Sequence, residues 1–317
     1  MEESKISIVG KAQEILNQVH KAVVGKDSVL LWTLAAILSG GHVLVEDIPG
    51  VGKTTMALAF SRVLGLDYNR IQFTPDVLPS DVTGYSVLNQ ASGELEFKPG
   101  AVMCNLLLAD ELNRATSRTQ SALLEAMEEG QVTVDGVSYP LPNPFIVMAT
   151  QNPAGAAGTQ LLPDSQMDRF SVRISMGYPA PKDEVLMVMQ RQGKDPLRAL
   201  EPVVSAEELT EMQQIVAQTH VSEEIARYVV NLVEATRCCD QLTRGASPRA
   251  TLAVVAMAKA VARLRGRDYL VPKDVQEVFV TTVAHRLHLA PHVDGQVESP
   301  REVLRTLISK VQPPKLR

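Results

Sequence analysis

Residues 42–54 (HVLVEDIPGVGKT) contain an apolar run, a glycine turn and then Gly-Lys-Thr at the expected start of a helix. Such a turn directs backbone N–H groups and a helix N-terminus toward one anion. Lys53 adds a positive charge for the β- and γ-phosphates of a nucleotide, and the hydroxyl of Thr54 is a ligand for Mg²⁺. The pattern predicts a phosphate-binding loop, and an ordinary glycine turn between strand and helix is the alternative.

Asp47 departs from this pattern, which asks for glycine six residues before the lysine. Aspartate is one of the few residues besides glycine that tolerate a left-handed backbone. The turn can therefore still form with Asp47 at this position. Its effect on nucleotide affinity stays open.

Two carboxylates, Asp110 and Glu111, follow the apolar run of residues 105–109. We expect Asp110 to hold Mg²⁺ through its water shell and Glu111 to orient and polarise an attacking water. The alternative is that both carboxylates cap the following helix, which is expected to begin near Ala115. The phosphate-binding loop upstream favours the catalytic interpretation.

Three more polar residues are candidates for the same site. Asn152 follows the apolar run of residues 145–149, and its amide can accept from water and donate to a phosphate, although Asn-Pro is also a common turn. Arg169 either pairs locally with Asp168 or Asp164 or reaches the γ-phosphate of a neighbouring subunit. Arg249 lies in the first turn of an expected helix, the unfavourable end of the dipole for a cation, which favours a role in a site.

The elements that must position these residues alternate between strands and helices. The expected strands are residues 42–46, 70–73, 105–109, 145–149 and 171–174, and helices are expected over residues 54–64 and 119–129. This alternation predicts an α/β fold with a parallel sheet covered by helices on both faces. Residues 86–97 form two further expected strands around Ser92-Gly93, and residues 131–139 form a tight hairpin at Asp135-Gly136.

After about residue 179 the pattern is entirely helical. Ser205 with Glu208 forms a capping box, Ser222 is an expected N-cap, and Ser247 precedes Pro248 at the start of a helix over residues 248–264. The expected buried face of that helix is Leu252, Val255, Ala256 and Ala260. This region is predicted to be a small helical bundle.

The composition restricts the class of protein. The 317 residues are 45% hydrophobic, and the longest apolar run, residues 29–38, is too short to span a bilayer. The three cysteines match no disulfide framework or metal pattern, and the acidic N-terminus matches no signal peptide, so we expect a cytoplasmic protein. A net charge of −5 and 4% aromatic residues argue against a dedicated nucleic-acid surface.

These motifs together resemble the AAA+ ATPases, and among them the MoxR family, from about residue 23 to residue 270. The most specific blocks are residues 73–76 (FTPD), 78–84 (LPSDVTG), 109–115 (ADELNRA), 119–128 (TQSALLEAME), 149–153 (ATQNP), 168–170 (DRF) and 245–250 (GASPRA). The resemblance implies a P-loop core with a five-stranded parallel sheet over residues 1–178 and a small all-helical lid over residues 179–317.

The resemblance also assigns roles to the candidate residues. It implies a Walker A loop of Pro49, Gly50, Val51, Gly52, Lys53, Thr54 and Thr55, a Walker B pair of Asp110 and Glu111, sensor 1 at Asn152, an arginine finger at Arg169 and sensor 2 at Arg249. Val24 and Gly25 match the segment that lines the adenine pocket, and Arg249, as a lid residue, is expected to act on the nucleotide of its own chain. Residues 86–97 correspond to the helix-2 insert and residues 131–139 to the hairpin before sensor 1. In relatives these two segments face a ring pore or a partner.

The function implied is that of an ATPase with ATP and Mg²⁺ that forms a homo-oligomeric ring, expected to be a hexamer. It would remodel or activate a partner protein, or insert a cofactor or metal into it, and the partner often carries a von Willebrand A-type domain. A chelatase-type motor subunit stays open. A nucleic-acid motor is disfavoured because residues 131–139 contain no Lys or Arg, and a scaffold without turnover because Glu111 and Arg169 are present. Residues 154–158 (AGAAG) replace a Glu-containing stretch that family members often carry.

Overall fold

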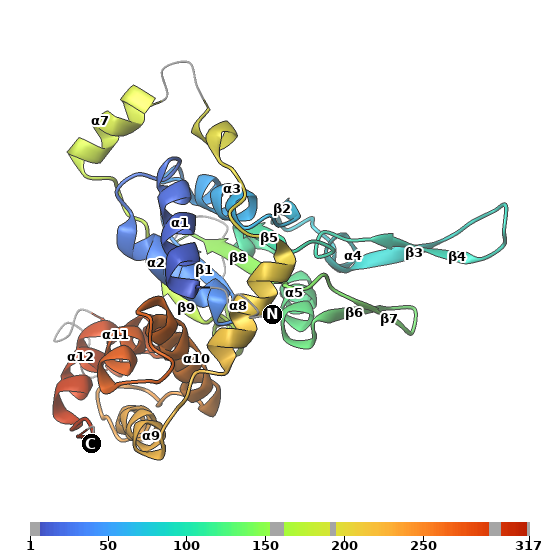
Figure 1. Ribbon diagram of the computed structural model, residues 1–317. Helices are drawn as coiled ribbons and strands as arrows, with labels where there is room; N and C mark the ends of the chain where they lie inside the picture. The colour runs from blue at the N-terminus through green and yellow to red at the C-terminus, as the bar shows by residue number, and fades with distance from the viewer. Residues whose placement is uncertain (1–6, 153–161, 191–194, 292–298, 316–317) are drawn as a thin grey trace, which may run out of the picture.

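The computed structural model describes residues 7–152, 162–190, 195–291 and 299–315 (Figure 1). Residues 154–158 of the uncharged loop lie outside these ranges. The central sheet has five strands in the order β2-β5-β8-β1-β9, and every pairing in it is parallel. The strands are β1 Val43–Glu46, β2 Tyr68–Gln72, β5 Leu106–Asp110, β8 Ile146–Gln151 and β9 Val172–Ile174. The predicted α/β fold and its five-stranded sheet are confirmed.

Helices cover both faces of this sheet, as predicted. On one face α1 Ile8–His20, α2 Asp27–Leu38 and α3 Lys53–Val63 pack against Val43 and Val45 of β1. On the other face α4 Pro79–Thr83 and α5 Ser117–Glu129 pack against Leu44 of the same strand. Because side chains alternate along a strand, buried apolar residues on both faces make β1, β5 and β8 read as continuous apolar runs.

Two hairpins extend from the same side of the sheet (Figure 1). One pairs β3 Gly84–Leu88 with β4 Leu95–Pro99, and the other pairs β6 Gln131–Val134 with β7 Val137–Pro140. Asp135 and Gly136 have φ of 51° and 79°, as the tight turn of the second hairpin requires. The ring of Phe97 stacks on that of Tyr139 with centroids 3.9 Å apart, so the hairpins lie side by side.

Beyond β9 the described residues form helices and no further named strand. They are α7 Pro181–Gln190, η2 Pro196–Ala199, α8 Ala206–Ala217, α9 Glu223–Arg237, α10 Pro248–Leu264, α11 Pro272–Val283, η3 Ala284–Arg286 and α12 Pro300–Lys310. Ser205, Ser222 and Ser247 each accept a hydrogen bond from a backbone N–H in the first turn, so the three predicted N-caps are confirmed. One continuous apolar core joins α8–α12 to α1–α3.

The predicted buried face of α10 is wrong, although the bounds of the helix are right. The buried side chains include Val254, Met257, Ala258 and Val261, whereas Leu252 is 71% exposed. Apolar residues occupy two sides of this helix, so periodicity alone could not decide which side faces α8, α9 and α11. Among the predicted four, Ala260 is buried.

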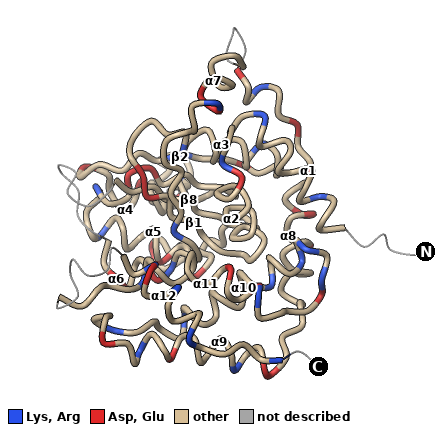
Figure 2. Tube along the Cα trace, turned by 90° about the vertical axis from the view of Figure 1, so that its left-hand side faces the viewer, with Lys and Arg blue, Asp and Glu red and all other residues tan. Residues whose placement is uncertain are grey.

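Charged residues of both signs lie interleaved beside the short helix α6 Asp164–Met167 (Figure 2). They include the pairs Arg244–Asp164 and Arg286–Asp168, which join the segment before β9 to the helices that follow it. None of the described helices has the length and apolar character needed to cross a membrane.

Candidate active site

The loop between β1 and α3 has the geometry of a phosphate cradle. Gly50 and Gly52 adopt φ of 86° and 99°, angles that residues with a Cβ atom rarely adopt. Gly52 is the N-cap of α3. A Cβ added at Gly50 would meet nothing within 4 Å, so the loop backbone faces open space. Lys53, Thr54 and Thr55 form the first turn of α3, whose N-terminus favours an anion. The loop therefore fits the phosphates of a nucleotide.

The turn forms with Asp47 in place of glycine, although Asp47 does not use the left-handed backbone that aspartate tolerates. Among the described residues other than glycine, only Glu111 and Asp135 have positive φ. The carboxylate of Asp47 instead accepts hydrogen bonds from Ile48 N at 2.9 Å, Gly177 N at 2.7 Å and Ser175 Oγ at 3.0 Å. Asp47 thus ties the beginning of the loop to the segment after β9, which the sequence pattern could not show.

These hydrogen bonds also fix the charge of Asp47. Burial raises the pKa of this carboxyl, but the hydrogen bonds from Gly177, Ser175 and Ile48 together outweigh it and leave the pKa below its ordinary value. Asp47 is therefore ionised at neutral pH.

Lys53 folds back over its own loop. Its Nζ donates to the carbonyl oxygens of Asp47 at 2.7 Å and Ile48 at 3.2 Å. Burial lowers the pKa of Lys53, and the negative charges of Asp47, Asp110 and Glu111 oppose that shift. The ammonium is thus held beside the loop, and the two carboxylates at the end of β5 lie close enough to influence it electrostatically.

Asp110, the last residue of β5, is anchored on two sides. Its Oδ1 accepts from Thr150 Oγ1 of β8 at 2.6 Å, and its Oδ2 pairs with Arg70 of β2 at 2.7 Å. Both partners come from the strands that flank β5 in the sheet. The sheet order therefore orients this carboxylate.

Glu111 stands just beyond the strand with a left-handed backbone, φ 54°. Its Oε2 accepts from Gln72 Nε2 and from Arg114 Nη1, both at 2.9 Å, and its Oε1 accepts from Asn152 Nδ2 at 3.1 Å. The hydrogen bond from Arg114 is the main cause of a pKa below the ordinary value for Glu111, so the side chain is a carboxylate.

Neither carboxylate caps α5. Thr116 is the N-cap of that helix, and its hydroxyl oxygen accepts from Thr119 N. The capping alternative for Asp110 and Glu111 is therefore wrong, and both groups are available at the carboxyl edge of the sheet.

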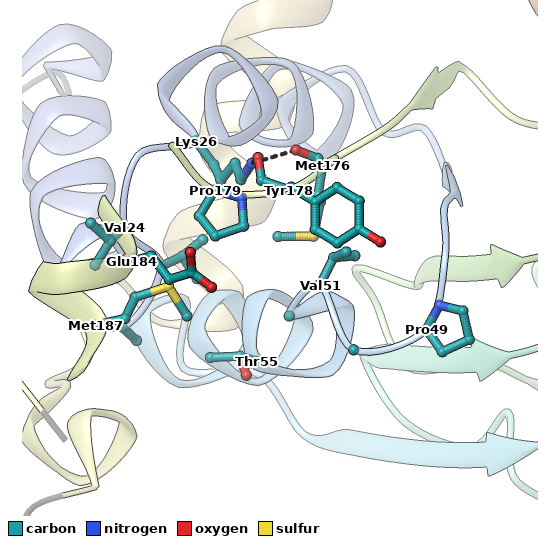
Figure 3. Close-up of a pocket in the computed structure, with 14 residues that line it drawn as sticks. Val24, Lys26, Pro49, Val51, Thr55, Met176, Tyr178, Pro179, Glu184 and Met187 are labelled. Atoms are coloured by element: carbon teal, nitrogen blue, oxygen red, sulfur yellow. Dashed lines mark hydrogen bonds between the residues drawn. The ribbon is translucent and has the colours of Figure 1, made fainter. Parts of the chain in front are cut away.

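A pocket opens beside the phosphate loop (Figure 3). The lining comprises Ala22, Val23, Val24, Lys26, Pro49, Gly50, Val51, Gly52, Thr55, Met176, Tyr178, Pro179, Glu184 and Met187. Gly25, next to Val24, has φ 68°, and a Cβ there would stand 2.0 Å from Asp183 Oδ2, so α7 approaches this segment closely. Most of the predicted loop residues and Val24 thus share one cavity.

The sequence did not indicate the wall of this pocket opposite the loop. Lys26 Nζ donates to the carbonyls of Met176, Gly177 and Tyr178 at 2.5, 3.1 and 2.8 Å, which fixes the segment between β9 and α7 over the pocket. Glu184 of α7 completes the wall. These residues lie about 150 positions from Lys26 in the chain and match no local motif.

Arg169 and Arg249 share one carboxylate. Arg169 Nη2 lies 2.9 Å from Oε2 of Glu128, near the end of α5, and Arg249 pairs with Oε1 of the same side chain. The alternative that Arg169 pairs locally with Asp168 or Asp164 is therefore wrong.

The two aspartates have other partners. Asp168 accepts from Arg286 at 2.5 Å and from Ser247 Oγ at 2.8 Å, and Asp164 pairs with Arg244 and His288. Arg169 and Arg249 line a separate hollow with Glu128 and do not line the pocket of the phosphate loop.

Comparison with known proteins agrees with this arrangement. Residues 42–172 match the ATPase family associated with various cellular activities (AAA), and residues 234–307 match the AAA lid domain. The uncharacterized protein YeaC of Bacillus subtilis is 44% identical over 97% of this chain and 95% of its own length. Chaperone MoxR1 of Mycobacterium tuberculosis is 41% identical over 94% of this chain and 81% of its own length.

The chain belongs to the MoxR family of AAA+ ATPases. A crystal structure of a candidate ATPase from Cytophaga hutchinsonii superposes with a TM-score of 0.89 at 37% identity, covering 96% of both chains. The AAA match contains the phosphate loop, both carboxylates, Asn152 and Arg169, whereas Arg249 lies in the lid match. This MoxR-family chain is thus an ATPase that binds nucleotide.

Proposed function

We propose that this ATPase hydrolyses ATP at sites shared between two copies of the chain, which assemble into a homo-oligomeric ring, a hexamer. The observation that carries the proposal is the pairing of Arg169 and Arg249 with Glu128, outside the pocket of their own phosphate loop. Two guanidinium groups beside each other on a surface form a cationic patch suited to the phosphates of a neighbouring chain.

This arrangement changes the expected role of Arg249. As a lid residue it was expected to serve the nucleotide of its own chain, but it lies beside Arg169 on the same carboxylate. We infer that both arginines act in trans. Their side chains are 28% and 44% exposed, so a neighbouring chain can reach them.

Within one copy, the remaining site residues would bind the phosphates, hold Mg²⁺ and activate the attacking water. The N–H groups of Gly50–Gly52 and the ammonium of Lys53 would hold the phosphates. Thr54 and Asp110 would hold Mg²⁺, which neutralises charge on the phosphates when bound. Glu111, a carboxylate held by Asn152 and Arg114, would accept a proton from the attacking water.

The substrate that we propose is a protein that the ring remodels or activates, in a chaperone-like role. The relative named Chaperone MoxR1 supports this class of function. The tip residues Leu88 and Leu95 of the first hairpin are 61% and 65% exposed and offer an apolar contact for a polypeptide. We further propose that the partner carries a von Willebrand A-type domain and that the ATPase helps to insert a metal or cofactor into it.

The test is capture of the partner by a variant that binds ATP without turnover. Tagged Glu111→Gln protein with ATP should retain a protein that tagged Lys53→Ala protein does not, because only the former holds nucleotide and stays assembled. Mass spectrometry then identifies the retained protein. Equal recovery on both variants, or recovery of nucleic acid in place of protein, would contradict the proposed substrate class.

A further inference from the structure

Helix α10 carries an apolar stripe that the rest of the described chain leaves partly exposed. Arg249, Leu252, Ala253 and Ala256 are spaced at i, i+3, i+4 and i+7 and therefore share one side of the helix. All four line the hollow that also contains Arg169 and Glu128. We call these four residues the outer stripe. It begins at an arginine of the proposed shared site and continues as an apolar surface.

The apolar surface extends past Leu252 into a second hollow. This hollow lies between α10, α8 and the end of α2, and its lining includes Leu38, Gln213, Val255 and Lys259. Leu252 and Ala256 line both hollows. With 71% of its area exposed, Leu252 forms a ridge between two depressions into which a neighbouring helix can fit.

Helix α7 carries a second apolar surface, on the other half of the shared site. Its residues Glu184 and Met187 line the nucleotide pocket. Val185 and Val188, spaced at i and i+3, are 63% and 66% exposed, and Tyr178 just before the helix is 79% exposed. We call Val185 and Val188 the flank of α7. The helix stands clear of the other helices in Figure 1.

We propose that the flank of α7 packs against the outer stripe of α10 from a second copy of the chain. This inference rests on the proposed function, because arginines that act in trans must bring their own helix to the neighbour's pocket. Arg249 is the first-turn residue of the stripe, and α7 is the rim of the pocket that Arg249 would enter. From Arg249 to Ala256 the stripe is about 10 Å long.

The contact has a functional consequence. Glu184 and Met187 face the nucleotide pocket from the same helix whose flank meets the neighbour. A change in that pocket on nucleotide binding or release would therefore move α7 against the neighbouring lid. The pairing gives each site a mechanical connection to the next lid, separate from the charge contact of the arginines.

Cross-linking between copies tests the contact directly. In a Cys238→Ser, Cys239→Ser background, one protein carries Val188→Cys and another carries Leu252→Cys. The two are mixed with ATP and a short bis-maleimide. The mixture should give a covalent dimer, and each protein alone should give little, because the contact joins position 188 to position 252. A matched control combines Val230→Cys, on the 47% exposed Val230 of α9, with Leu252→Cys. A yield from the mixture no higher than this control, or equal cross-linking of Val188→Cys alone, would overturn the proposal.

Charge substitutions give a second readout. Val188→Asp and Leu252→Asp should each raise the protein concentration needed for half-maximal ATPase activity by about tenfold or more, because they place a charge in a desolvated contact. Val230→Asp should leave it unchanged. If a mixture of Lys53→Ala and Arg169→Ala proteins regains turnover while the cross-link fails, the docking is wrong and the shared site stands. If the mixture regains no turnover and the cross-link does not form, the proposed function itself is wrong.

Discussion

Asn152 Nδ2 donates a hydrogen bond to Glu111 Oε1 at 3.1 Å, and the two residues directly follow the neighbouring strands β8 and β5. The two residues are 41 positions apart in the chain, and the parallel pairing of Ala109 with Ala149 brings them together. An amide on one oxygen and Arg114 and Gln72 on the other fix the carboxylate. A carboxylate held in this way can orient a water without losing its charge.

Glu111→Gln should therefore separate binding from turnover. The amide has nearly the shape of the carboxylate but cannot accept the proton, so ATP should bind while kcat falls about 10²-fold or more. Steady-state phosphate release with nucleotide titration by calorimetry measures both quantities. Asp110→Asn should instead increase the Mg²⁺ concentration needed for activity. Normal hydrolysis by both variants would remove these carboxylates from the mechanism.

Lys53→Ala should abolish ATP binding and leave the fold intact. The ammonium contacts two loop carbonyls and no apolar core, so its loss affects mainly the phosphate site. Calorimetric titration with ATP and a circular dichroism spectrum test the two halves of this statement. Unchanged affinity would contradict the assignment of the phosphate loop.

Asp47→Ala should destabilise the protein and weaken nucleotide binding. It removes the acceptor of three hydrogen bonds, two of which join the loop to Ser175 and Gly177, and leaves donors unpaired. The expected loss in the free energy of unfolding is about 1–3 kcal/mol. Urea unfolding measures it, with Asp76→Ala, at an exposed position, as the matched control. Equal stability of the two variants would show that the contacts of Asp47 do not hold the loop.

Burial lowers the pKa of His42 from its ordinary value of 6.5 to about 4 in the folded protein. The free energy of unfolding should therefore decrease as the pH falls below about 6.5. Between these values the unfolded chain binds a proton that the folded chain excludes, so acid favours unfolding. The contribution of His42 is about 2 kcal/mol less at pH 5 than at pH 7. Burial also lowers the pKa of His285, which adds a loss of the same sign. Urea unfolding at both pH values should show a smaller difference for His42→Gln than for the wild type, and an equal difference would contradict this role of His42.

The sequence predicted those parts of the fold that depend on local patterns. Continuous apolar runs located the buried strands β1, β5 and β8, Asp135-Gly136 located a hairpin, and serine caps located three helix starts, since each signal depends on neighbouring residues. The wrong predictions concern contacts between distant segments. Two partners of Asp47, Ser175 and Gly177, are about 130 positions away in the sequence, and Glu128 is 41 positions from Arg169. The face of α10 depended on which neighbours it meets, and no local rule shows that.

The two arginines carry the central claim that the site is shared between copies. Arg169 and Arg249 lie on one carboxylate, so both should serve the neighbouring nucleotide. Each Arg→Ala variant should bind ATP almost normally and hydrolyse it slowly. For Arg169→Ala, kcat should fall by about 10³–10⁵, the factor typical of arginine fingers.

The most direct measurement is ATPase activity in mixtures of inactive variants. Lys53→Ala protein mixed with Arg169→Ala protein should regain part of the wild-type turnover, because an intact Lys53 loop on one copy meets an intact arginine on the next. A mixture with Arg249→Ala should regain it as well. No recovery in either mixture, together with wild-type activity per molecule that does not depend on protein concentration, would contradict the shared site.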